Sequence, residues 1–167
     1  MDEKSEVSGG SSQARPVLVA VDFSSDSESA LIWGVNYAHL ISAPLIALHV
    51  IHDSVDNPGF YNKEGHSALL PLEEIAREKM DDFFQGLSEN HPELKDLLLV
   101  DRKFATGIPA GRIVEVAANE NAQIIVMGTR GRTGLSNLLL GSVAKQVLQG
   151  SAIPVVVLKS EQVKPKG

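Results

Sequence analysis

The chain has no cysteine, few aromatic residues and more acidic than basic side chains. Without cysteine it can form no disulfide framework, no cysteine-ligated zinc site and no thiol nucleophile, a composition that suits a reducing cytoplasm. Its 15 Lys and Arg stand against 21 Asp and Glu, which leaves a net charge of −6. Because a net-acidic chain binds nucleic acids and acidic membranes poorly, we predict neither as a partner. Any anion site must then be a local cluster of donors.

Long apolar runs are absent as well, since none approaches the roughly 18 residues that a membrane-spanning helix needs. The first residues include Asp2, Glu3 and Glu6, where a secretory signal needs basic and then apolar side chains, so we predict a cytoplasmic protein. The Ser- and Gly-rich start predicts a disordered tail over residues 1–15. The length then predicts one folded domain over residues 16–160 and a short C-terminal tail over 161–167.

The apolar residues are arranged as short runs that alternate with amphipathic segments. The runs predict strands at 16–21, 45–51, 97–105, 123–127 and 154–158, and the amphipathic segments predict helices at 25–41, 72–87, 109–117 and 142–149. A capping box over 25–28 marks the start of the first helix. Strands that are apolar on both faces and alternate with helices are typical of an α/β fold, an open and mainly parallel sheet with helices on both faces. In such sheets ligands bind beyond the carboxyl ends of the strands, at a topological switch point.

The segment with the most chemical information lies between the fourth strand and the fourth helix. Its glycines allow a close approach of the backbone to a ligand, and it ends at Gly141 and Ser142, where unpaired N–H groups of a helix start favour a phosphate. Arg130 and Arg132 add two positive charges to an otherwise acidic chain. No lysine precedes the hydroxyl residue, and the first strand lacks a G-x-G-x-x-G turn, so the segment is neither a Walker A loop nor a dinucleotide fingerprint. A plain connection whose glycines serve turns and packing remains the structural alternative.

The spacing Gly128-x2-Gly131-x9-Gly141-Ser142 resembles the ATP-binding signature of the universal stress protein family. The resemblance extends from residue 17 to 158 and includes Asp22 after the first strand and Gly107-x-Pro109 after the third. It implies a sheet of order 3-2-1-4-5, homodimers, and ATP or AMP bound where strands 1 and 4 diverge. It departs from the family pattern only in the tail and in the loop at 52–68.

The resemblance also implies roles for single residues. Asp22 would contact the ribose or adenine side of the nucleotide, and Val50 would read adenine through its backbone. Gly128, Gly131, Gly141 and Ser142 would hold phosphates, with Met127 and Gly107 lining the pocket. A local alternative is open for Asp22 and Ser142, because both also suit a helix start. With the two arginines, the predicted nucleotide site is Asp22, Val50, Gly107, Met127, Gly128, Arg130, Gly131, Arg132, Gly141 and Ser142.

We therefore predict an adenine-nucleotide-binding stress or signalling protein whose ligand is ATP, or else ADP or AMP. Mg²⁺ shared with the phosphates is a further candidate, because this ion needs few protein ligands, and we assign no metal-ligating side chain. A slow ATPase or nucleotidyl transferase is one alternative, although the sequence indicates no catalytic base and at most weak ATP hydrolysis. A nucleotide-free dimeric interaction module is the other.

The last strand, from Pro154 to Leu158, carries a separate prediction. The order 3-2-1-4-5 implied by the resemblance places this apolar strand at an edge of the sheet. An exposed apolar edge strand is an aggregation hazard unless something pairs with it. We therefore predict that it pairs with its own copy in a symmetric homodimer.

Overall fold

The computed structural model describes residues 14–52, 72–130 and 140–160. Residues 1–13, 53–71, 131–139 and 161–167 lie outside this part of the chain, and with them two predicted phosphate-site residues, Gly131 and Arg132. Tertiary contacts already involve Arg15, whose guanidinium donates hydrogen bonds to the carbonyls of Asn121 and Ala122 at 3.0 and 2.9 Å.

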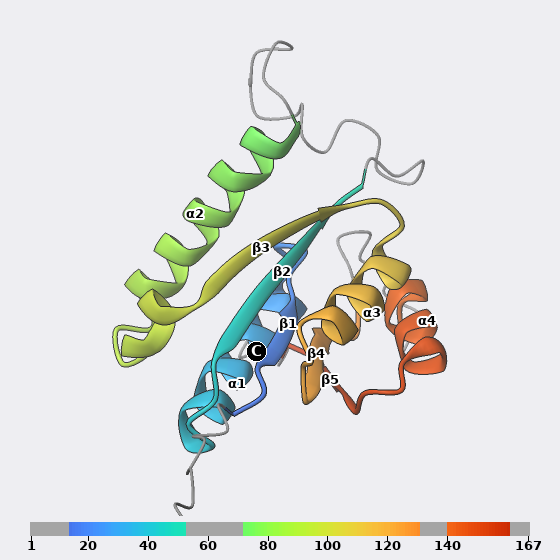
Figure 1. Ribbon diagram of the computed structural model, residues 1–167. Coiled ribbons are helices and arrows are strands. Elements are labelled where there is room, and N and C mark those ends of the chain that lie inside the picture. Colours follow the sequence, from blue (N-terminus) through green and yellow to red (C-terminus); the bar gives the residue numbers. More distant parts are fainter. Residues whose placement is uncertain (1–13, 53–71, 131–139, 161–167) are drawn as a thin grey trace, which may run out of the picture.

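The sheet has five parallel strands in the order β3-β2-β1-β4-β5, which confirms the predicted fold class and strand order (Figure 1). Every strand is followed by a helix except the last. The elements in chain order are β1 (Val17–Ala20), α1 (Ser25–Leu40), β2 (Leu45–Ile51), α2 (Leu72–Asn90), the 3-10 helix η2 (Lys95–Leu99), β3 (Asp101–Thr106), α3 (Pro109–Asn119), β4 (Ile124–Gly128), α4 (Ser142–Gly150) and β5 (Val155–Leu158).

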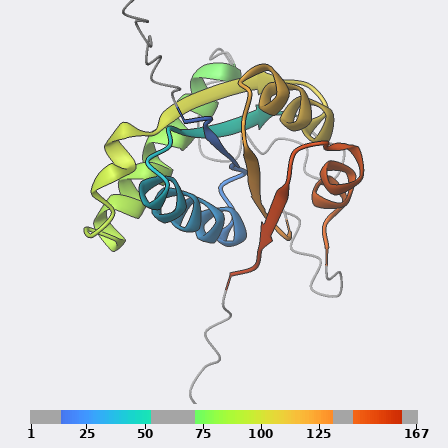
Figure 2. The same ribbon diagram turned by 60° about the horizontal axis from the view of Figure 1, so that its bottom comes forward.

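Helices cover both faces of the sheet, as predicted (Figure 2). The alternation of side chains along β1 divides the core in two. Val17 and Val19 pack with α1 and α2, whereas Leu18 and Ala20 pack with α3 and α4. Every residue of β1 is buried, and the strand lies in the middle of the sheet.

The first helix begins one residue earlier than the capping box indicates. Its N-cap is Ser24, whose hydroxyl accepts the Ser27 N–H at 3.2 Å, so the predicted cap at Ser25 is wrong. Helix α1 also lies very close to β1. A Cβ atom on Gly34 would come within 2.5 Å of a Val19 methyl group, so a glycine at this point permits the contact.

The third strand is shorter than the predicted one. Its start at residue 97 is wrong, because the leucine run belongs to η2 and β3 begins at Asp101. Burial before the strand has a period of three: Leu94, Leu97 and Val100 are buried, while Leu98 and Leu99 are 87% and 79% exposed. A 3-10 helix repeats every three residues and produces this pattern, which an apolar run does not distinguish from a buried strand.

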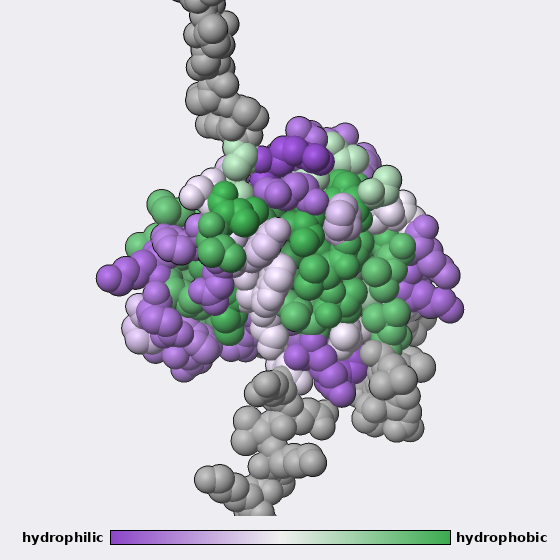
Figure 3. All heavy atoms as spheres, turned by 90° about the horizontal axis from the view of Figure 1, so that it is seen from below, coloured by the Kyte–Doolittle hydropathy of each residue, from purple (hydrophilic) through white to green (hydrophobic). Residues whose placement is uncertain are grey.

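The edge strand β5 pairs with β4 and is partly exposed along its whole length. Figure 2 places β5 in front on the lower side of the molecule, and Figure 3 shows a broad apolar area on that side. No helix in the described part of the chain is long and apolar enough to cross a membrane.

Candidate functional site

The strand register brings several predicted site residues to one edge of the sheet. In the β1–β2 pair, Ala20 lies opposite Leu48, and the Val21 N–H donates to the Leu48 carbonyl at 2.8 Å. Continued by two residues, this register places Asp22 level with Val50. On the other side of β1, Val19 lies opposite Val126, which places Met127 and Gly128 just before the level of Asp22. These residues therefore meet where β1 and β4 end, at the switch point of the sheet.

Gly107 lies farther along the same edge. Its N–H donates to the carbonyl of Ile51 at 3.2 Å, next to Val50. Its φ of +136° is a conformation that side chains rarely adopt, and a Cβ atom would lie 3.3 Å from Cγ of Arg112. The turn after β3 thus requires glycine for its own conformation, whatever it contacts in addition.

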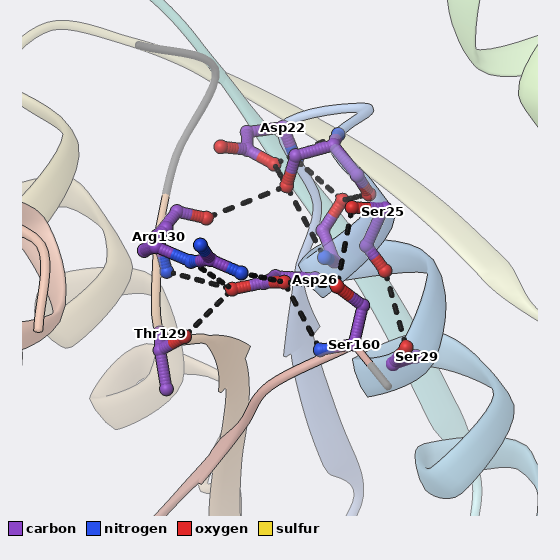
Figure 4. A network of polar contacts seen from close by, with 9 residues as sticks. Asp22, Ser25, Asp26, Ser29, Thr129, Arg130 and Ser160 are labelled. Carbon is purple, nitrogen blue, oxygen red and sulfur yellow. Dashed lines mark hydrogen bonds and ion pairs between the residues drawn. The ribbon is translucent and has the colours of Figure 1, made fainter. Parts of the chain in front are cut away.

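Asp22 forms a tight turn with the cap of α1. Its Oδ1 accepts the Ser24 N–H at 3.1 Å and the Ser24 hydroxyl at 2.5 Å (Figure 4). Between them Phe23 has a φ of +66°, an uncommon value for a bulky residue. The structure therefore shows the local capping role that was open for Asp22, and its contact with a nucleotide stays a prediction.

A buried histidine stabilises the turn at Asp22. His49 is 1% exposed, and its Nδ1 donates to the Val21 carbonyl at 2.7 Å. A carbonyl can only accept, so the proton lies on Nδ1. The Phe23 ring packs on the imidazole with centroids 4.4 Å apart, and together these contacts fix the backbone on both sides of Asp22.

A second carboxylate, Asp26 in the first turn of α1, connects three segments of the chain (Figure 4). It is 2% exposed and accepts hydrogen bonds from Thr129 Oγ1 at 2.6 Å, from the Arg130 N–H at 3.1 Å and from the Ser160 hydroxyl at 2.6 Å. Burial alone would raise the pKa of Asp26. The hydrogen bonds from Ser160, Thr129 and Arg130 outweigh burial and hold that pKa well below its usual range.

Arg130 belongs to this cluster. Its side chain is 18% exposed, and its Nε and Nη2 lie 3.3 and 3.4 Å from the Asp26 carboxylate. The predicted contact of this arginine with a phosphate is thus in competition with an internal partner, which sequence spacing does not reveal.

The glycine at the end of β4 has a packing reason. A Cβ atom on Gly128 would lie 2.7 Å from Cβ of Asp26, 2.9 Å from its backbone carbon and 3.1 Å from the Ser27 nitrogen. Helix α1 can approach β4 this closely only because residue 128 has no side chain. A contact of Gly128 with a phosphate remains a prediction.

Gly141 and Ser142 begin the helix on the far side of the loop. The Gly141 N–H donates to the carbonyl of Thr129 at 2.6 Å, so the two ends of the segment between β4 and α4 meet. Gly141 is the N-cap of α4 and has no side chain to accept the first amides of the helix, while Ser142 is exposed. These amides are the donors that an anion needs at a helix start.

Sequence reasoning missed Asp26, Thr129, Ser160 and His49. A signal was present for the first three, because each is a polar residue shortly after β1, β4 or β5, and the carboxyl ends of parallel strands share one edge. His49 gave no such signal, since a single histidine in an apolar run does not indicate its partner. Among the described residues no group of three or more His, Asp or Glu is placed to hold a metal ion.

Comparison with known proteins gives a consistent result. The universal stress protein family matches residues 13–159. Universal stress protein MJ0531 of Methanocaldococcus jannaschii is 30% identical over 160 residues, which cover 96% of this chain and 88% of that protein. Universal stress protein MJ0577 of the same organism is 31% identical, with 87% of this chain and 94% of that protein covered.

Solved structures agree on the fold. The MJ0577 structure superposes with a TM-score of 0.63 at 30% identity and covers 89% of this chain and 97% of that one. The universal stress protein from Archaeoglobus fulgidus in complex with dAMP has a TM-score of 0.56 at 20% identity, with 87% and 98% covered.

Proposed function

This chain belongs to the universal stress protein family, and on that premise we propose that it binds an adenine nucleotide, with ATP as the expected ligand. The site lies beyond the carboxyl ends of β1 and β4, where α4 begins. The bound nucleotide acts as a conformational ligand in a cytoplasmic stress response or signalling role. The dAMP complex of the Archaeoglobus fulgidus protein, which has the same fold, supports adenine as the base.

One observation carries the proposal: the backbone does not require a glycine at position 141. Its φ of −69° and ψ of 158° are open to every residue, and Ser, Thr, Asp and Asn are preferred at an N-cap. A glycine there gives up a cap hydrogen bond but leaves the first amides of α4 open to a ligand. The first turn of α4 also carries no acidic residue that would repel an anion.

For the other residues of the site we keep the roles predicted from the sequence. Asp22 lies two residues beyond β1, level with Val50 of β2, which suits the adenine and ribose side, and Gly141 and Ser142 suit the phosphates. If Mg²⁺ accompanies the phosphates, it neutralises part of their charge and needs few protein ligands. The full proposed set keeps Gly107, Met127, Gly128, Arg130, Gly131 and Arg132 with these four residues.

We propose no catalytic residue. Asp22 accepts two hydrogen bonds from Ser24, and Asp26 is held by donors from three segments. Both carboxylates are thus engaged in fixing turns, an arrangement that does not favour either as the base for an attacking water.

Mass spectrometry of the small molecules released by heat denaturation of the purified, undialysed protein tests the proposal. We expect ATP, ADP or AMP at roughly one equivalent per chain, and none from bovine serum albumin treated in parallel. An empty extract, followed by no thermal shift of the protein with ATP and Mg²⁺, would refute nucleotide binding and favour an interaction module. If ADP is released, fresh ATP added to the protein shows whether that ADP reflects turnover.

We also propose that β5 pairs with its own copy in a homodimer. The strand has a partner on one side only among the described residues, and its four side chains are partly exposed. Val156→Lys places a charge in the middle of this edge, so we expect the variant to sediment as a monomer while the wild type sediments as a dimer. Leu98→Lys is the matched control, because Leu98 is 87% exposed in η2 at the opposite side of the sheet. A dimer that persists in Val156→Lys would contradict this interface.

A further inference from the structure

Asp26 holds the entrance of the segment that joins β4 to α4. Its Oδ2 accepts both the Thr129 hydroxyl, at 2.6 Å, and the Arg130 N–H, at 3.1 Å. Thr129 in turn accepts the Gly141 N–H on its carbonyl at 2.6 Å and donates its own N–H to Leu158 at 2.8 Å. One carboxylate therefore fixes Thr129, where the two ends of the segment between β4 and α4 meet; we call this segment, from Thr129 to Gly141, the anion loop.

The other oxygen of the same carboxylate binds the chain after β5. Asp26 Oδ1 accepts the Ser160 N–H at 3.0 Å and the Ser160 hydroxyl at 2.6 Å. In Figure 4, Thr129, just after β4, and Ser160, shortly after β5, approach Asp26 from different sides, with the carboxylate between them. The start of the loop and the chain beyond the edge strand are thus tied to a single side chain.

We infer that Asp26 is a positioning residue for the nucleotide site, and that Ser160 makes phosphate affinity depend on the segment after β5. The inference rests on the proposed function and adds to it a coupling between the anion loop and the edge at which a second copy would pair. We call the cluster of Asp26, Thr129, Arg130 and Ser160 the carboxylate clasp.

The charge of Asp26 and its positioning role predict opposite effects of its loss on ATP affinity. The Asp26 carboxylate neutralises the Arg130 guanidinium, so removing the negative charge leaves a positive one beside the loop, and charge alone would strengthen the binding of ATP. Loss of the clasp releases Thr129 and with it the amide of Gly141, which would weaken binding. The direction of the change therefore separates the two effects.

Asp26→Asn is the first test, because an amide of the same shape carries only one accepting oxygen and places a donor against the donors of Ser160 or Arg130. We expect its Kd for ATP, measured by calorimetry, to rise about tenfold. The Kd for adenosine, which has no phosphate, should change less than about twofold. ATP affinity that is unchanged or tighter in this variant overturns the inference.

Ser160→Ala is the second test, and it keeps the inference open to refutation if Asp26→Asn does not fold. It removes the hydroxyl's hydrogen bond to Asp26, together with a contact of 3.3 Å to the exposed Ser25 hydroxyl, and changes no charge. We therefore expect a rise of about threefold in the Kd for ATP. Ser29→Ala is the matched control, since the Ser29 hydroxyl bonds only the Ser25 carbonyl of its own helix among the described residues. An effect of Ser160→Ala no larger than that of Ser29→Ala overturns the coupling.

Amide exchange followed by NMR in the nucleotide-free protein separates this inference from the proposed function. Loss of the clasp should speed the exchange of the Arg130 and Gly141 amides, whose acceptors are Asp26 and Thr129. If the wild type binds no ATP, the proposed function fails, and faster exchange still supports the clasp. Unchanged exchange of both amides in Asp26→Asn overturns it.

Discussion

Gly128→Ala is expected to lower the free energy of unfolding by about 3 kcal/mol. The new methyl group would lie 2.7 and 2.9 Å from Cβ and the backbone carbon of Asp26, and backbone atoms cannot yield as the tip of a flexible side chain can. Helix α1 must then move away from β4, which also draws Asp26 away from Thr129. Urea unfolding of the nucleotide-free protein, analysed by linear extrapolation, measures the loss.

Gly86→Ala provides the control for this substitution. Gly86 lies inside α2, and a Cβ atom there would have nothing within 4 Å. Because alanine is the better helix former, we expect this variant to be stabilised by about 0.5–1 kcal/mol. Equal stability of Gly128→Ala and wild type would show that α1 can retreat from β4 at no cost, and the packing explanation of Gly128 would then be wrong.

Gly141→Val is expected to weaken ATP binding by about a hundredfold while the fold survives. The backbone at residue 141 accepts a side chain, but a branched one at the N-cap would stand in front of the amides that the phosphates need. Isothermal titration with ATP measures the loss, and the thermal midpoint without ligand verifies the fold.

Gly111→Val is the matched control for the binding experiment. Gly111 lies in the first half of α3, and a Cβ atom there meets nothing within 4 Å. We expect its ATP affinity to equal that of the wild type. Undiminished binding by Gly141→Val would reject the pocket at the start of α4 and, with it, the proposed phosphate site.

Much of the fold was predictable because its signals are local. The apolar runs at β2, β4 and β5 and the helices between them follow from periodicity, and the strand order follows from the family resemblance. The start of β3 was not predictable in this way, since an apolar run does not show that Leu97 is buried in η2 while Leu98 and Leu99 are exposed. The cap of α1 was misplaced by one residue because Ser24 and Ser25 are both good caps, and only the Ser27 N–H selects between them.

The candidate site was predictable only in part. Its position at the carboxyl ends of the strands and the glycines near it follow from the sequence, but the structural reason for each glycine does not. Gly107 serves its own φ, Gly128 serves the approach of α1, and the φ and ψ of Gly141 do not require glycine, and this distinction requires coordinates. The carboxylate clasp joins residues 103 to 134 positions apart, and no local pattern reports a contact at that separation.

The central place of β1 also sets the order in which the molecule can assemble. On one side β1 pairs with β2, the next strand in the chain, and on the other with β4, which comes only after β2 and β3. Closing the longer loop costs more chain entropy, so the half-sheet β3-β2-β1 can gather before β4 and β5 dock. The clasp needs all three of α1, β4 and the residue beyond β5, so it is complete only once β4 and β5 have docked. A chain still lacking its final strand can bring Asp26 to Thr129 and Arg130, but it has no Ser160 to complete the clasp.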